Sequence, residues 1–252
     1  MIRGLNVIFI GPAGCGKTSL TKAFGEWSER ELGMTIAYVN LDPGVLNLPY
    51  KPDYDVRELV TVHRLMLEEG LGPNGAMIKA SEIMDENIGL IAEKIASLDA
   101  DLRLIDTPGQ MELFLFRPMG PRLSEAISKN SPSITVYISD PSLASSPSGL
   151  AISLSMALIT WFRLSTPTVP VINKIDAFEG GLEKLLMDPS MLKKSLLMEE
   201  GLIADLATEY MSLVEELLKS MRIVEVSAKT GEGMPALYDL IHEALCECGD
   251  LS

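Results

Sequence analysis

Cysteine and histidine are both scarce in this sequence of 252 residues. The three cysteines, Cys15, Cys246 and Cys248, are too few and odd in number to form a disulfide framework. Cys246 and Cys248 lack further ligands at metal-binding spacing, and the histidines, His63 and His242, have no neighbouring ligand either. These absences predict structural roles for the histidines and a reducing, cytoplasmic environment.

Long apolar runs are also missing. The N-terminal run, in MIRGLNVIFIG, is a short predicted strand and too brief for a signal peptide. The most apolar later stretch, residues 150–164, is shorter than the roughly 18 residues that a membrane-spanning helix needs. We therefore expect no membrane association. We expect a core helix over these residues, and an exposed groove for a partner is the less favoured alternative.

The sequence has few positively charged residues. It contains 21 Lys and Arg and 35 Asp and Glu, which gives a formal net charge of -14. This balance disfavours direct nucleic-acid binding, which needs a basic face, although a small basic phosphate site remains compatible with it. The chain is long enough for one sizeable core, and we expect a single domain over residues 1–252.

Short apolar runs rich in β-branched residues alternate with segments of helical periodicity. The runs are residues 5–11, 35–42, 102–108, 133–140, 168–176 and 222–228. The alternation predicts an α/β fold with three layers, in which helices cover both faces of a mostly parallel sheet. Residues 53–98 and 180–221 exceed a minimal crossover and are predicted helical insertions, with a helix start near Asp188 or Ser190 in the second.

The motif GPAGCGKT follows the first predicted strand and precedes a helical run, which is the context of a phosphate-binding P-loop. Its glycines allow backbone amides to surround phosphate oxygens. Lys17 supplies charge to the β and γ phosphates, and the Thr18 hydroxyl is a predicted Mg²⁺ ligand. The predicted phosphate-binding residues are Gly11, Pro12, Ala13, Gly14, Cys15, Gly16, Lys17, Thr18 and Ser19.

The stretch LRLIDTPGQ places Asp106 at the end of a buried strand, where open α/β sheets bind ligands. This carboxylate is predicted to hold magnesium or to polarise the attacking water. The Gly109 amide is predicted to meet a γ-phosphate, and Gln110 to orient a hydrolytic water. In YVNLDPGV, Asp42 is predicted to lie near magnesium or the water, with a simple capped turn as the alternative.

The stretch VINKIDAF carries Asn173, Lys174 and Asp176 after another predicted strand. The Asp176 carboxylate can accept hydrogen bonds from the N1–H and the amino group of guanine, a pair of donors that adenine lacks. Asn173 is expected to brace the loop and meet the base, and the Lys174 stem to lie along its face. Ser227 and Ala228 are expected to offer a backbone N–H to the guanine oxygen. The set therefore favours GTP and disfavours ATP.

With these motifs in this order, the sequence resembles the GPN-loop GTPases. The matching positions are residues 11–18, 40–44, 72–74, 106–110, 173–176 and 227–228. Taken alone, Gly72-Pro73-Asn74 predicts only a turn between two helices. The resemblance implies a magnesium-dependent homodimer that converts GTP to GDP, in which Asn74 reaches the partner's phosphates. It further implies that Asp106 and Gln110 position the water with help from Asp42. Eukaryotic members are linked to RNA polymerase, a possible client here, but this chain resembles the single-domain archaeal members more closely.

The sequence departs from its relatives at two places. Pro12 and Ala13 stand where related division-site ATPases carry a lysine that acts in the partner, so no such lysine is predicted here. Gly44 stands where many family members have alanine. Arg117 and Arg122 are candidate arginine fingers, although ordinary surface roles are favoured for both. A nucleotide-gated assembly factor with negligible turnover remains the alternative to an enzyme.

Overall fold

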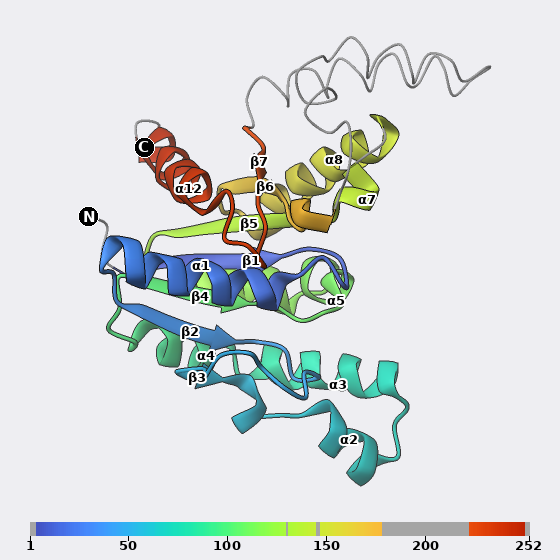
Figure 1. The fold of residues 1–252 in the computed structure, drawn as a ribbon. Helices are drawn as coiled ribbons and strands as arrows, with labels where there is room; N and C mark the ends of the chain where they lie inside the picture. Colours follow the sequence, from blue (N-terminus) through green and yellow to red (C-terminus); the bar gives the residue numbers. More distant parts are fainter. Residues whose placement is uncertain (1–3, 130, 145–146, 178–221, 250–252) are drawn as a thin grey trace, which may run out of the picture.

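The computed structural model describes residues 4–129, 131–144, 147–177 and 222–249 (Figure 1). Their strands form one sheet in the order β3-β2-β4-β1-β5-β6-β7, and every neighbouring pair is parallel. The strands are β1 (Leu5–Ile10), β2 (Ile36–Asn40), β3 (Tyr54–Asp55), β4 (Leu102–Asp106), β5 (Ser133–Ser139), β6 (Thr168–Ile172) and β7 (Val224–Glu225).

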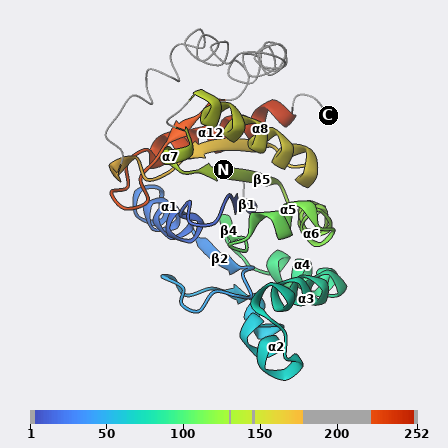
Figure 2. The ribbon, with the colours of Figure 1, turned by 90° about the vertical axis from the view of Figure 1, so that its right-hand side faces the viewer.

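Helices cover both faces of this sheet, so the predicted three-layer α/β fold is confirmed. The α-helices are α1 (Lys17–Leu32), α2 (Val62–Glu69), α3 (Pro73–Glu86), α4 (Ile88–Ala96), α5 (Met111–Phe116), α6 (Met119–Ser128), α7 (Pro141–Ala144), α8 (Pro147–Leu164) and α12 (Met234–Gly249). Two short 3-10 helices, η1 (Val56–Glu58) and η2 (Ile175–Ala177), accompany them. Figure 2 shows α1 and α6 on opposite sides of the strands.

The central strand β1 explains why two cores form. Leu5, Val7 and Phe9 belong to the core that includes residues of α1 and α12, whereas Ile8 and Ile10 belong to the core beneath α3–α6 and α8. Successive side chains of a strand point to opposite faces, so this strand, which is apolar at every position except Asn6, serves both cores.

The structure describes the first of the two predicted helical insertions but not the second. Residues 53–98 do carry α2, α3 and α4, but they begin with the unpredicted strand β3 and the helix η1. Tyr54 and Asp55 form this strand because they pair in parallel with Val39 and Asn40. Residues 180–221, including the predicted helix start near Asp188 or Ser190, lie outside the described residues.

The apolar stretch at residues 150–164 lies within α8, as predicted, but not all of it is core. Leu150, Leu154 and Ala157 are buried, whereas Ile152 and Phe162 are 50% and 72% exposed. The Ser/Pro-rich segment that precedes it contains the short helix α7. Within the described ranges, no helix has the length and apolar character to cross a membrane.

Candidate nucleotide site

The P-loop connects β1 to α1, as the motif predicts. Gly16 has φ 93° and precedes the first residue of α1, and Gly14 has φ 79°. Residues that carry a Cβ atom rarely adopt these positive φ angles. At Gly11, a Cβ atom would overlap the carbonyl oxygen of Ile138. Glycine at these positions lets the loop turn tightly against the sheet, which is the shape that phosphate binding requires.

Lys17 is buried beneath this loop and is held by backbone oxygens. Its Nζ donates to the carbonyl oxygens of Gly11, Pro12 and Gly109 at 2.8, 3.1 and 3.4 Å. Neutral carbonyl groups orient the ammonium without neutralising its positive charge. The charge is therefore placed for a phosphate, and the Gly109 bond connects the P-loop to the turn after β4.

A cavity of about 200 Å³ opens at this point. Its lining residues are Gly14, Gly16, Lys17, Thr18, Ser19, Asp42, Thr107 and Gly109. The structure thus brings five of the nine predicted P-loop residues together with two of the predicted strand-end residues, Asp42 and Gly109. Parallel strands make this convergence possible, because their carboxyl ends meet at one edge of the sheet.

Asp106 lies at the end of β4 and is only 1% exposed. Its Oδ2 accepts a hydrogen bond from the Tyr50 hydroxyl at 3.0 Å, whereas Oδ1 has no hydrogen-bond partner in the part of the chain that the structure describes. Burial raises the pKa of Asp106 to about 6, against the lowering effects of the neighbouring Thr18 and Tyr50 hydroxyls and of Lys17.

A divalent cation suits this carboxyl group. A buried carboxylate oxygen without a partner carries a desolvation cost that a cation removes. Oxygen donors are the ligands that Mg²⁺ prefers, and Thr18 and Asp106 supply a hydroxyl and a carboxylate side by side. The predicted third ligand, Asp42, lines the same cavity. The residues present therefore fit magnesium.

Asp42 joins the two turns that border the phosphate cavity. Its Oδ1 accepts from the backbone N–H of Gly44 at 2.8 Å, which closes a capped turn. Its Oδ2 accepts from the backbone N–H of Gly109 at 3.0 Å. Asp42 thus makes the capped turn of the simpler alternative and also a contact between turns. The Gly109 amide, predicted to meet a γ-phosphate, is bound to this carboxylate in the structure.

The base of the Asp42 turn is fixed by hydrogen bonds and an ion pair among Asn40, Asp55 and Arg57. Asn40 is fully buried and donates to Asp55 Oδ1 at 2.9 Å, while its own Oδ1 accepts from the Asp42 amide. Arg57 pairs with Asp55 and donates to the carbonyl oxygens of Val45 and Leu46. The unpredicted strand β3 therefore supports the turn that carries Asp42.

The residues expected to read a base follow β6. Asn173 is buried, donates to the Cys15 carbonyl oxygen at 2.9 Å and accepts from the Ala228 amide at 3.1 Å. It braces the P-loop as expected, and its predicted contact with the base stays a prediction. Lys174 has φ 70° and donates to the Gly14 carbonyl oxygen and to Asp140 Oδ2. The Lys174 side chain thereby lies across the edge of the P-loop.

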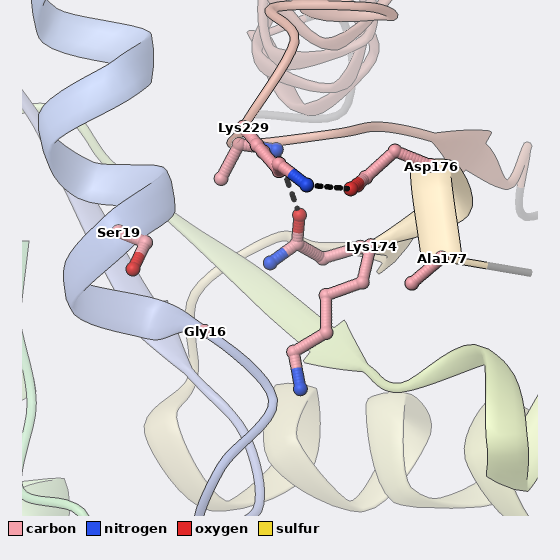
Figure 3. Close-up of a pocket in the computed structure, with 8 residues that line it drawn as sticks. Gly16, Ser19, Lys174, Asp176, Ala177 and Lys229 are labelled. Atoms are coloured by element: carbon pink, nitrogen blue, oxygen red, sulfur yellow. Dashed lines mark hydrogen bonds and ion pairs between the residues drawn. The ribbon is translucent and has the colours of Figure 1, made fainter.

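A second cavity, of about 370 Å³, lies beside these residues. Its lining residues are Gly16, Ser19, Asn173, Lys174, Asp176, Ala177, Ala228 and Lys229 (Figure 3). Asp176 accepts from the Ser227 hydroxyl at 2.6 Å, and Lys229 approaches its other oxygen at 3.8 Å. The Ser227 and Ala228 amides donate to Glu232 and Asn173, so their predicted contact with a guanine oxygen stays a prediction.

Several predicted residues lie outside both cavities. Gln110 precedes α5 and is exposed, and no hydrogen bond joins it to Asp106 in the described ranges. Asn74 is exposed in the first turn of α3. Figure 1 shows the α2–α3 connection apart from the P-loop between β1 and α1. Arg122 forms a salt bridge with Asp85 of α3, and Arg117 is exposed, so neither candidate finger lines the cavities.

Sequence reasoning missed Tyr50 and Asp140. Asp140 directly follows β5, so its position at a strand end was a usable signal for a residue of this site. Tyr50 lies in the loop between β2 and β3, and the pattern LNLPY gives no sign that its hydroxyl reaches β4.

The whole chain is similar to known proteins. A family model described as a conserved hypothetical ATP binding protein matches residues 9–247. The GPN-loop GTPase PAB0955 of Pyrococcus abyssi is 40% identical over 252 residues, which cover 98% of this chain and 99% of that protein. GPN-loop GTPase 1 of Dictyostelium discoideum is 28% identical over 94% of this chain, which spans 60% of that relative's length. The solved apo structure of the GTPase PAB0955 has a TM-score of 0.86 at 39% identity and covers 96% of this chain and 98% of that one.

The parallel sheet, the P-loop and the strand-end carboxylates define a P-loop nucleotide-binding protein. The match along nearly the full chain identifies the particular branch: the chain belongs to the GPN-loop GTPase family.

Proposed function

We propose that this protein binds GTP with Mg²⁺ and hydrolyses it to GDP and phosphate. The observation that carries the proposal is the pair of adjoining cavities, which share Gly16 and Ser19. One cavity has the Lys17 ammonium for phosphates, and the other has the Asp176 carboxylate for a base. A nucleoside triphosphate that spans both cavities places its phosphates at the Lys17 ammonium and its base at the Asp176 carboxylate.

The carboxylate of Asp176 is the basis for proposing GTP over ATP. It accepts from Ser227 through one oxygen, which fixes its orientation, and keeps acceptor capacity for donors of a base. Guanine offers two such donors on one edge, whereas an adenine there would leave the carboxylate unpaired. The relatives' names as GTPases support the same choice.

Hydrolysis by this chain is a matter of charge and positioning. The Lys17 ammonium and the P-loop amides hold the β and γ phosphates, and Asp106 and Gln110 place the water in line with the γ-phosphate. Thr18, Asp106 and Asp42 would hold the magnesium ion, which neutralises negative charge that develops on the phosphates. Because Gln110 is exposed, its side chain can turn toward the reacting water, which Asp42 would help to position.

We further propose a cytoplasmic homodimer whose shape follows the nucleotide. The Gly72-Pro73-Asn74 turn is exposed and lies apart from its own P-loop, which is consistent with a role in the partner's site. The bond between Asp42 and the Gly109 amide gives the switch a physical basis. A γ-phosphate at this amide would displace the carboxylate, and loss of the phosphate would restore the bond. By family analogy, RNA polymerase is a candidate client.

A nucleotide-gated assembly factor with negligible turnover is the second candidate, and the exposed position of Gln110 outside the lining of both cavities favours it. Two measurements test the proposed function. Calorimetric titration with GTP and ATP tests the base selection, and equal affinities would refute it. Phosphate release with GTP at saturating Mg²⁺ tests turnover, and binding without release would favour the assembly factor.

A further inference from the structure

The loop between β2 and β3 carries a tyrosine that reaches the buried carboxylate of β4. Tyr50 lies 56 residues before Asp106, and its hydroxyl donates to Asp106 Oδ2 at 3.0 Å. The other oxygen, Oδ1, is buried and has no hydrogen-bond partner among the described residues. The described part of the protein therefore fixes one oxygen of this carboxylate and leaves the other oxygen available to a ligand.

The ring of Tyr50 is held in place by its own set of contacts. It stacks on Tyr38 of β2, with ring centroids 5.0 Å apart and planes inclined by 22°. The end of the loop returns to the same strand, because the Tyr38 amide donates to Asp53 Oδ2 and the Asp53 amide to the Tyr38 carbonyl oxygen. The aromatic stack thus holds the ring, and the two hydrogen bonds of Asp53 hold the end of the loop, before any ligand binds.

The Tyr50 hydroxyl serves this carboxylate as a neutral hydrogen-bond donor. A protonated hydroxyl donates one hydrogen bond and brings no charge into the site. It therefore orients the carboxylate without competing for a cation by charge.

We infer that Tyr50 is a positioning residue, whose hydroxyl fixes Asp106 so that the free carboxylate oxygen is ready for the magnesium ion that accompanies the nucleotide. The inference rests on the proposed function, because it assumes that Asp106 serves the nucleotide-bound magnesium. Partners that hold a metal-binding carboxylate by hydrogen bonds set its orientation and influence metal affinity. Tyr50 joins Asp42 as the second residue of the β2–β3 loop that acts on this site.

The test compares Tyr50→Phe, which removes the hydroxyl and keeps the stacked ring, with Tyr38→Phe, which removes the hydroxyl of the other stacked ring. Affinity for a fluorescent GDP analogue is measured across a range of Mg²⁺ concentrations and in EDTA. We expect Tyr50→Phe to need about tenfold more Mg²⁺ for half of the magnesium-dependent gain in affinity. Its affinity in EDTA should stay within about twofold of the wild type, and Tyr38→Phe should match the wild type throughout.

An unchanged magnesium requirement in Tyr50→Phe would overturn the inference, and so would an equal change in both variants, which would assign the effect to the stack. Thermal melting without nucleotide checks that both variants are folded. If wild-type affinity itself does not respond to Mg²⁺, the magnesium part of the proposed function fails as well. That outcome is distinct from failure of the Tyr50 inference alone, in which the wild type responds to Mg²⁺ and the variant matches it.

Discussion

The Asp42 carboxylate accepts a hydrogen bond from the Gly109 backbone amide at 3.0 Å, and this bond joins the turn after β2 to the turn after β4. Both residues line the phosphate cavity. An amide that binds one anion can bind another, so we expect the γ-phosphate of GTP to compete with Asp42 for this N–H. We therefore expect the two turns to respond differently to GTP and to GDP.

Replacement of Asp42 by alanine should therefore change nucleotide preference. We expect affinity for a non-hydrolysable GTP analogue to rise about tenfold relative to GDP, because the phosphate no longer displaces a charge-assisted hydrogen bond. Turnover should fall, because a ligand for magnesium and water is lost. Titration with both nucleotides measures the ratio, and Glu93→Gln on the exposed part of α4 controls for the lost charge. An unchanged ratio would contradict competition at Gly109.

Replacement of Asp176 by asparagine should move base preference from GTP toward xanthosine triphosphate. Xanthine carries an oxygen where guanine carries the amino group, so it offers an acceptor to the new side-chain amide. Competition between the two nucleotides for the variant measures the change. Ser227→Ala is the matched comparison, because it leaves the carboxylate but removes its 2.6 Å bond, and should weaken GTP binding without favouring xanthosine triphosphate. Retention of full GTP preference in Asp176→Asn would refute the assignment.

The proposed role of Asn74 in the partner's site predicts complementation between two inactive chains. Lys17→Ala lacks the phosphate-binding ammonium and Asn74→Ala lacks the exposed amide, so each should be strongly impaired alone. Mixed in equal amounts, they form dimers in which the intact Asn74 of one chain serves the intact P-loop of the other. Random pairing makes about one site in four functional, and about a quarter of wild-type phosphate release should return.

Exchange into mixed dimers is verified by capture of one tagged chain. Mixed dimers without recovered activity would contradict a role of Asn74 across the interface. A mass that corresponds to a monomer with both GDP and a non-hydrolysable GTP analogue would remove the dimer itself.

The raised pKa of Asp106 predicts that the free energy of unfolding of the nucleotide-free protein depends on pH. Its folded pKa of about 6 lies above the ordinary value of 3.8, so the folded state binds this proton more readily. The free energy of unfolding therefore falls as pH rises from about 4 to 6 and levels off above that. Asp106→Asn lacks this titration and should be more stable than wild type by about 3 kcal/mol at pH 8, an advantage that disappears near pH 4.

Urea denaturation at both pH values, without nucleotide or Mg²⁺, measures this difference. Equal stability of the two proteins at pH 8 would show that burial does not penalise the Asp106 carboxylate.

The sequence patterns predicted the sheet well because its strands are buried on both faces. Mostly apolar runs such as residues 5–10 are easy to recognise in the sequence, and parallel pairing places every motif that follows a strand at one edge of the sheet. β3 was missed because two residues form it, and its pairing with β2 depends on the end of a long loop. The helix α7 was not predicted because a sequence rich in serine and proline is typical of loops, although both residues also suit helix starts.

Contacts inside the site were predictable only where a motif contains them. The bond between Asn173 and the Cys15 carbonyl oxygen joins two motifs that follow β6 and β1, two strands that lie on either side of β5. The bond between Tyr50 and Asp106 depends instead on the path of an irregular loop, which no periodicity describes. For the same reason the sequence placed Gly109 opposite a phosphate and did not anticipate its bond to Asp42.

Phosphate release from GTP is the most direct test of the account. Wild-type protein with Mg²⁺ should release phosphate from GTP and much less from ATP. Asp106→Ala and Gln110→Ala should each lower the rate at saturating GTP by at least about tenfold, as expected when a group that positions the water is lost. No release by the wild type, or undiminished release by both variants, would contradict the proposal that this site hydrolyses GTP.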